Sequence, residues 1–319
     1  MKIAFFSEIG NFSGIEYPRN FENMRTDVAW SVALKAKNYS FDTNSFDLHE
    51  ISKEVPDLGI IIVPKKYPNK AFSFYERMKG QIRMWSVMQE GPQTFWQDWN
   101  IPHQIEYIKL LNQVQVIFCH NEYDERYYRG LIPGKEVRIL PSLMIEDAIP
   151  KTLVLPEHRV GTMVGGNWVS WYSGQDSYFI AQELGEQVYA PSMGRKQEYE
   201  DYIEDIIYSP YRTWSKWMID LSTRKYAVHL MRTFAAGTFA LNCAYLGVPC
   251  IGYEQLDTQR ICFPELSVEL GDLESARKIA RNLKENKLFY AHVSSYAKKA
   301  YHDNFREEIF IRNFNESLK

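Results

Sequence analysis

Residues 226–252 constrain the fold of this chain more than any other segment. An apolar run, Tyr226–Leu230, leads through a short loop into an amphipathic segment, Phe239–Leu246. Gly247-Val248-Pro249 then separates that segment from a second apolar run, Cys250–Gly252. A strand, a helix and a strand joined by short connections are typical of one unit of a parallel sheet, so the segment predicts an α/β fold.

The loop before the predicted helix ends in small residues, Ala235-Ala236-Gly237-Thr238. Small residues let an anion approach the backbone, and the first amide groups of a helix attract it together with the positive end of the helix dipole. Ala236, Gly237 and Thr238 are therefore predicted to bind a phosphate group. Helix capping and close packing of helix against strand are the plainer alternative.

Strands and helices alternate along the whole chain, whose 319 residues exceed what a single core usually supports. Further strands are predicted at 2–6, 58–63, 83–89, 114–120, 137–141, 160–164 and 187–190, and further helices at 24–37, 102–113, 176–184, 197–207 and 273–286 and at the C-terminus. Residues 149–158 have no periodicity and form the predicted linker between domains 1–150 and 151–319. The last helix is a candidate to cross back to the first domain. We expect two doubly wound, Rossmann-like α/β domains that face each other across a cleft, because ligands bind beyond the carboxyl ends of such strands.

The overall charge argues against a general nucleic-acid binder. The chain carries 37 basic and 40 acidic residues, a formal charge of −3, whereas such binders show a basic excess. A local basic groove stays compatible with this balance, and six basic residues lie between two predicted strands: Lys65, Lys66, Lys70, Arg77, Lys79 and Arg83. A solvated basic surface is the alternative reading of that stretch.

Apolar patterning predicts a cytoplasmic protein without a membrane span. No stretch approaches the roughly 18–20 apolar residues that cross a bilayer, and the apolar run at the N-terminus is too short for a signal peptide. The four cysteines form no CxxC pair, and three of them lie in apolar runs. We therefore expect buried free thiols in a reducing compartment.

The order of elements and the segment 236–249 resemble the GT-B glycosyltransferases and their relatives, the UDP-N-acetylglucosamine 2-epimerases. In the epimerases a Ser-Gly-Gly turn precedes a helix that bears a Glu, followed by Leu-Gly-x-Pro. Ala236-Gly237-Thr238 stands at the turn, and Leu246-Gly247-Val248-Pro249 matches the end. Asn242 stands where the family carries the Glu that binds the ribose, and Phe234 replaces the first Glu of the paired-glutamate motif of many retaining members.

A second resemblance, to the phage DNA β-glucosyltransferase, concerns a few residues at matching elements. Gly10-Asn11 follows the first strand, and Glu90 ends the 83–89 strand where that enzyme carries its catalytic Asp. Gly165-Gly166-Asn167 opens the second domain, followed by Ser173-Gly174-Gln175. The arginines that clamp the donor phosphates in that enzyme are absent here. This resemblance implies a modified DNA base as acceptor, with a glycan or small molecule as the alternative.

Further donor-site residues are predicted around the phosphate seat. Gly165, Gly166 and Asn167 permit backbone approach to a phosphate or sugar, although a tight turn explains them equally well. Arg232 precedes the helix, where a guanidinium pairs bidentately with a diphosphate, or else forms a surface ion pair. Glu254 follows the 250–252 strand and is placed to contact the sugar or ribose.

Other polar and aromatic residues near these positions have weaker signals. Gln255 extends the loop of Glu254, and His229 ends its strand, where a half-buried histidine without a ligand is the plainer reading. Trp168, Trp171 and Tyr172 could stack on a sugar or a base, or belong to the core or surface.

Two carboxylates are candidates for the catalytic base. Glu90 ends a strand before Gly91-Pro92, and a carboxylate there could accept the proton of an acceptor hydroxyl. Asp27 begins the first long helix, where inverting GT-B enzymes often place their base. A favourable interaction with the helix dipole is the alternative for Asp27, and Arg25 beside it could bind an anionic acceptor or be solvated.

Absent motifs narrow the chemistry. The chain has no Asp-x-Asp, HExxH or Cys/His cluster, so neither a divalent metal nor zinc is expected. It also lacks GxxxxGK[ST] and GxGxxG, which argues against a P-loop NTPase and a typical NAD enzyme. We therefore expect a metal-independent hexosyl or pentosyl transferase without a further cofactor, which moves a sugar from a nucleotide sugar, foremost a UDP-sugar, to a hydroxyl acceptor. A nucleotide-sugar epimerase and a non-catalytic nucleotide- or sugar-binding protein are the alternatives.

Overall fold

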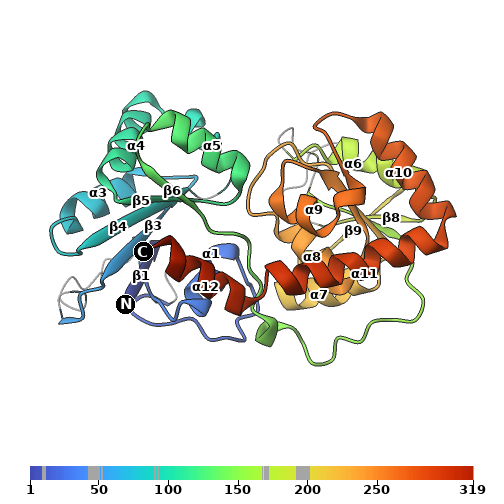
Figure 1. The fold of residues 1–319 in the computed structure, drawn as a ribbon, viewed down its shortest axis with the longest axis horizontal. Helices are drawn as coiled ribbons and strands as arrows, with labels where there is room; N and C mark the ends of the chain where they lie inside the picture. Colours follow the sequence, from blue (N-terminus) through green and yellow to red (C-terminus); the bar gives the residue numbers. More distant parts are fainter. Residues whose placement is uncertain are drawn as a thin grey trace. The chain divides into compact units, whose positions relative to one another are not determined.

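The computed structural model describes residues 1–8, 12–41, 51, 53–89, 91, 93–166, 168, 172–191 and 202–318. The chain divides into two compact units, each treated by itself below. Unit 1 comprises Met1–Phe21, Arg25–Pro141 and Phe310–Lys319, and unit 2 comprises Glu22–Met24 and Ser142–Ile309. Each unit has a six-stranded parallel sheet with helices on both faces (Figure 1). This two-sheet α/β architecture confirms the predicted fold class.

The sheet of unit 1 has the order β2-β1-β3-β4-β5-β6. Its strands are β1 (Ile3–Ser7), β2 (Lys37–Ser40), β3 (Leu58–Val63), β4 (Met84–Gln89), β5 (Val116–Cys119) and β6 (Glu136–Ile139). All neighbours pair in parallel, with Phe6 opposite Ile61 and Ile61 opposite Val87. The direction of strand addition reverses between β1 and β3, which makes the carboxyl ends of these two strands the expected ligand edge.

Both faces of this sheet are apolar, because helices cover each of them. The helices are α1 (Thr26–Ala33), α3 (Asn69–Met78), α4 (Ile101–Gln113), α5 (Glu122–Leu131) and α12 (Glu307–Ser317), with a 3-10 turn, η1 (Phe95–Asp98). Phe6 and Ile61 belong to the core that α3, α4 and α5 cover. On the other face, Phe118 of β5 packs on Phe314 of α12, with 5.9 Å between ring centroids. Alternate residues of one strand therefore serve two different helix layers.

The sheet of unit 2 has the order β12-β11-β10-β7-β8-β9, again parallel throughout. Its strands are β7 (Thr162–Val164), β8 (Val188–Pro191), β9 (Ile206–Ser209), β10 (Tyr226–His229), β11 (Cys250–Tyr253) and β12 (Ser267–Val268). The central pair aligns Ala227 with Met163 and Val228 with Val164. Here the direction of strand addition reverses between β7 and β10.

The helices of unit 2 form two groups by their contacts. They are α6 (Gly174–Glu183), α7 (Trp214–Ser222), α8 (Thr238–Leu246), α9 (Asp257–Cys262), α10 (Leu273–Glu285) and α11 (Lys287–Asn304), with 3-10 turns η2 (Glu146–Ala148) and η4 (Pro264–Leu266). Helix α6 packs against α10, whereas α8 packs against α7, α9 and α11 (Figure 1). All four cysteines are buried free thiols, which confirms that prediction.

One predicted element is wrong. The segment 197–207 was expected to be helical, but Ile206 and Ile207 begin strand β9, and residues 202–205 form no α-helix. The remainder of that prediction lies outside the described residues. Strand β9 is an edge strand in which only the end residues, Ile206 and Ser209, are buried, so it lacks the continuous apolar run that marks a central strand.

Candidate active site

The unit 2 site lies where segments following β7 and β10 come together. These are adjacent strands at which strand addition reverses, so ligands are expected beyond their carboxyl ends. The amide of Gly165, directly after β7, donates to the Val228 carbonyl of β10 at 2.8 Å. The amide of Leu230, directly after β10, donates to Ser177 Oγ in α6 at 2.9 Å. These bonds join two segments that lie about sixty residues apart in the chain.

Gly237 fixes the start of helix α8. Its φ of +71° is in the left-handed region, and a Cβ there would lie 2.0 Å from Thr258 Oγ1. Thr258 in turn donates to the Gly237 carbonyl at 2.9 Å. Conformation and space therefore both require glycine. No side chain caps α8, so its first turn presents backbone amides with the positive end of the dipole.

The next predicted donor residues flank that turn. Ala236 and Thr238 are partly exposed, and Thr238 Oγ1 lies 3.2 Å from Ser142 Oγ. Asn242 is only 3% exposed, one turn further along α8. With its amide oriented to suit its neighbours, Asn242 donates to the Thr238 carbonyl and accepts from Trp217 Nε1 at 3.2 Å. The side-chain amide of Asn242, which stands where the resembled family carries its ribose-binding Glu, is therefore engaged in contacts within and between helices.

The glycines after β7 pack against side chains. A Cβ on Gly165 would lie 2.3 Å from the His229 ring, and Gly166 has a φ of +80° beside Tyr172. His229 is 7% exposed, and its ring centroid lies 4.8 Å from that of Phe239 in α8. Burial lowers the pKa of His229 from 6.5 to about 4, so its ring is neutral at pH 7.

Arg232, in the segment after β10, forms an exposed ion pair with the segment after β7. Its Nη2 donates to Asp176 Oδ2, in the first turn of α6, at 3.2 Å, and its side chain is 60% exposed. An exposed pair of this kind contributes little to stability, so the guanidinium can turn to a bound anion at small cost. Glu254 follows β11 and is half-buried.

Three predicted site residues lie outside the described residues. They are Asn167 and Trp171, which follow β7 in the sequence, and Glu90, one of the two candidate bases. Gln89, which precedes Glu90, is buried at the end of β4, and its side-chain oxygen accepts from the Tyr128 hydroxyl at 3.3 Å.

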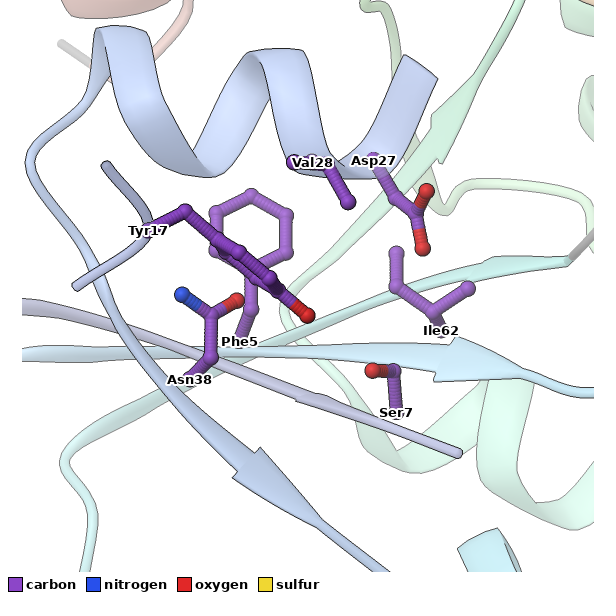
Figure 2. Close-up of a pocket in the computed structure, with 7 residues that line it drawn as sticks. All are labelled: Phe5, Ser7, Tyr17, Asp27, Val28, Asn38 and Ile62. Carbon is purple, nitrogen blue, oxygen red and sulfur yellow. The ribbon is translucent and has the colours of Figure 1, made fainter. Parts of the chain in front are cut away.

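Unit 1 has a polar hollow at its own reversal point, beyond β1 and β3. It is lined by Phe5, Ser7, Tyr17, Asp27, Val28, Asn38 and Ile62. Figure 2 shows the Asp27 carboxylate, the Tyr17 hydroxyl and the Ser7 hydroxyl directed into the same space. The side chains close the hollow to a water-accessible volume of about 0 Å³. It therefore collects polar atoms without holding a ligand-sized cavity.

Asp27 lies in the first turn of α1, where the helix dipole favours a carboxylate. Arg25 binds it with two hydrogen bonds, of 3.1 and 3.2 Å. The Asp27 side chain is 11% exposed and that of Arg25 48%. The carboxylate is thus held at the rim of the hollow, with the more exposed Arg25 guanidinium beside it.

Tyr17 and His120 face Asp27 and carry no strong signal in the sequence. Tyr17 is 5% exposed, and among the described residues its hydroxyl has no hydrogen-bond partner. Burial, and then the charge of Asp27, raise the pKa of Tyr17. Tyr17 lies in a loop and His120 just after a strand, and neither position belongs to a motif.

His120 follows β5 and stacks on Trp30 of α1, with ring centroids 5.6 Å apart. Burial lowers the pKa of His120 to about 4, against opposing effects of the Asp27 carboxylate and the Gln89 backbone. A neutral imidazole and a carboxylate therefore share this edge of unit 1 at neutral pH. Burial makes the imidazole a weak base, so Asp27 is the candidate proton acceptor at this edge.

Within the described ranges, no group of three or more His, Cys, Asp or Glu side chains could hold a metal ion. In the same ranges, no helix combines the length and the apolar character needed to cross a bilayer.

Comparisons with known proteins bear on the fold. No protein-family model matches the chain, and a search of curated proteins gives no match either. Among solved structures, sucrose-phosphate synthase from Thermosynechococcus elongatus is similar with a TM-score of 0.69 and 10% identity, over 99% of this chain and 98% of that one. Anabaena Alr3699/HepE in complex with UDP and glucose is similar with a TM-score of 0.67 and 10% identity, over 100% and 99%.

An alpha-glucosyltransferase in complex with UDP-glucose and DNA containing an abasic site is also similar. Its TM-score is 0.61 and its identity 14%, and the match covers 100% of both chains. This neighbour solved with DNA is an alpha-glucosyltransferase, whereas the sequence resemblance was to a β-glucosyltransferase. At these identities the likeness establishes the fold, and the fold of this chain is that of the GT-B glycosyltransferases.

Proposed function

We propose that this protein is a glycosyltransferase that moves a sugar from a UDP-sugar to a hydroxyl acceptor. The observation that carries the proposal is the uncapped start of α8 at Gly237, at the reversal point of the unit 2 sheet. Full-length structural similarity to Alr3699/HepE, solved with UDP and glucose, supports UDP as the nucleotide.

In this proposal the diphosphate binds at the first turn of α8. Its oxygens accept hydrogen bonds from the backbone amides that follow Gly237 and from Thr238, and the dipole adds a favourable field. Arg232 turns from Asp176 to the diphosphate and stabilises the charge that develops on the leaving UDP. Gly165, Gly166, Asn167 and Glu254 are the residues proposed to contact the sugar and nucleoside. Backbone amides and Arg232 take the place of a metal ion.

Unit 1 supplies the base in this proposal. Asp27 accepts the proton of the acceptor hydroxyl as the bond to the sugar carbon forms. Glu90 is the rival candidate for this role. The ring of His120 is neutral at pH 7, so the Arg25 guanidinium supplies the positive charge beside Asp27.

For the acceptor, a hydroxyl on a modified DNA base is the first to test. The support is the similarity, over 100% of both chains, to an alpha-glucosyltransferase solved with DNA. The basic stretch between Lys65 and Arg83, for which a solvated surface and a DNA-facing groove were both open, forms local contacts. Lys79 pairs with Glu76 at 2.6 Å, and Lys65 lies 3.8 Å from the Phe95 ring centroid. A glycan or small-molecule acceptor is the alternative.

The test combines binding with turnover. Calorimetry with UDP, GDP and CMP should show tightest binding of UDP, and UDP release from UDP-sugars should rise when hydroxymethylated DNA is added. Arg232→Ala should weaken UDP binding about tenfold. The control, Arg260→Ala, removes an arginine of unit 2 with a similar 3.1 Å pair to Asp257 and should leave binding unchanged. Equal effects of both variants, or no nucleotide binding at all, would contradict the proposal.

A further inference from the structure

A second, larger groove lies in unit 2 at the edge opposite the proposed donor seat. Arg159 and Lys225 precede β7 and β10, so both lie at the amino ends of these parallel strands. The groove has a volume of about 620 Å³, which is within the range of small-molecule sites. Its remaining wall comes from the end of α10 and the start of α11.

Positive charge gathers in this groove although the whole chain carries −3. The lining includes four cationic side chains, from Arg159, Lys225, Lys284 and Lys287, and one carboxylate, from Glu157. Lys225 pairs with Glu186 at 2.9 Å. In the part of the chain that the structure describes, neither Lys284 nor Lys287 forms an ion pair, although Lys284 interacts electrostatically with Glu186. Four cationic side chains therefore face two carboxylates, those of Glu157 and Glu186.

The surroundings confirm a local excess of positive charge. The Arg159 guanidinium donates to the Leu246 and Gly247 carbonyls at 2.7 and 3.0 Å, at the end of α8. Burial, and then the charge of Arg159, lower the pKa of Lys298 on α11. The Tyr290 hydroxyl donates to the Lys225 carbonyl at 3.0 Å and fixes an aromatic wall. The groove therefore combines fixed donors, an apolar surface and more cations than carboxylates.

We propose that this groove binds an anion with two or more phosphate charges, either a small compound that carries a phosphate monoester or a diphosphate, or successive phosphodiesters of a nucleic-acid backbone. Lys284 and Lys287, which form no ion pair among the described residues, provide two ammonium groups, and ammonium groups bind phosphate oxygens through short, charge-assisted hydrogen bonds. The cations exceed the carboxylates by two, so a ligand with a single carboxylate would neutralise only half of the excess. This site is independent of the donor seat, since the two lie at opposite ends of the same strands.

The test uses the full chain with saturating UDP, so that the start of α8 is occupied, and inorganic pyrophosphate as the probe in calorimetry. Lys284→Gln with Lys287→Gln should weaken pyrophosphate binding about tenfold or more. Both lysines are exposed, so the double variant should keep the melting temperature of the wild type.

The matched control is Lys216→Gln with Lys299→Gln, two exposed lysines of unit 2 outside the groove. It removes the same charge and should change pyrophosphate binding less than about twofold. No pyrophosphate binding by the wild type, or equal weakening in both double variants, would overturn the proposal. If UDP itself does not bind, the proposed function fails, while the contrast between the two double variants still decides the groove.

Single-stranded oligonucleotides of increasing length then identify the source of the phosphate. An affinity that rises with length, with a salt slope that falls by about 2 in the groove variant, supports a nucleic-acid backbone. Competition with pyrophosphate at an affinity independent of length supports a small phosphorylated compound.

Discussion

The two reversal points of the molecule are built from opposite chemistry. At the unit 2 edge, Gly237 and an uncapped helix present backbone donors, with Arg232 as a movable cation. At the unit 1 edge, Asp27, Tyr17 and Ser7 direct oxygen atoms into one hollow (Figure 2). Under the proposed function, one sheet topology serves as an anion seat in unit 2 and as a proton-accepting site in unit 1, and the side chains at the strand ends make the difference.

The largest effect on this contrast between the two edges is expected from a change at Asp27. Asp27→Asn keeps the shape of the side chain and removes its basicity, so kcat should fall about 10²–10⁴-fold. The UDP dissociation constant should stay unchanged, because Asp27 belongs to the proton-accepting edge. Steady-state kinetics and calorimetry on the same preparation measure both.

Glu90→Gln is the companion variant for this test. Full activity of Asp27→Asn together with inactivity of Glu90→Gln would transfer the role of base to Glu90. Weaker UDP binding in Asp27→Asn would show that the two edges are not chemically separate.

The dependence of the free energy of unfolding on acidic pH tests the role of His229 at the unit 2 edge. Its folded pKa of about 4 lies below 6.5, so the unfolded chain takes up a proton first as the pH falls. The stability that neutral His229 contributes is complete above about pH 6.5 and is lost between there and about pH 4, by about 3 kcal/mol. Denaturant unfolding of unit 2 should show this loss in the wild type.

His229→Leu removes the titrating ring and should flatten that part of the pH profile. His120 remains in the variant and titrates in unit 1, so the difference between the two proteins isolates His229. An unchanged slope in His229→Leu would mean that the buried ring does not govern the acid response.

Gly237→Ala tests the geometry of the anion seat. The new Cβ must displace Thr258, and the backbone angle at this position disfavours alanine. The free energy of unfolding should therefore fall by about 2 kcal/mol, and UDP affinity should decrease clearly. Gly271→Ala is the matched control, because its φ is +86° but no atom lies within 4 Å. Gly271→Ala should lower the free energy of unfolding by about 1 kcal/mol and leave UDP affinity unchanged. Similar behaviour of both variants would reduce Gly237 to an ordinary turn glycine.

The smallest effect is expected at Tyr17. Its buried hydroxyl has no partner among the described residues, so Tyr17→Phe should leave the free energy of unfolding unchanged or raise it by up to about 1 kcal/mol. In the same unit, Tyr107→Phe breaks a 3.0 Å bond to the Tyr128 hydroxyl and should lower stability by about 1 kcal/mol. Thermal melts compare the two. A destabilised Tyr17→Phe would mean that its hydroxyl is satisfied in solution.

Sequence patterns predicted the buried strands well, because a strand covered on both faces needs continuous apolar residues. Leu58–Val63 is strand β3 with the same bounds, and Phe239–Leu246 corresponds to α8 within one residue. Strand β2 (Lys37–Ser40) has no such run and was not predicted. Helix α5 (Glu122–Leu131) also escaped, because its charged and aromatic residues bury only one narrow side.

In the candidate site, the sequence predicted only those positions at which the local backbone conformation decides the residue type. Small residues before an amphipathic run pointed to Gly237, and its φ of +71° confirms a special backbone position there. The neighbours of Asn242 and His229 depend on Trp217 and Gly165, residues brought near by folding over long distances in the chain. Tyr17 and His120 acquire their surroundings in the same way, so their sequence context carries no comparable signal.

Helix α12 completes unit 1, although it follows all of unit 2 in the chain. Phe310 and Phe314, buried at 2% and 1% exposure, complete the apolar face of unit 1 around Phe118. A ribosome therefore synthesises all of unit 2 before unit 1 receives its last layer. During that interval an apolar surface of unit 1 stays open to chaperones or to self-association.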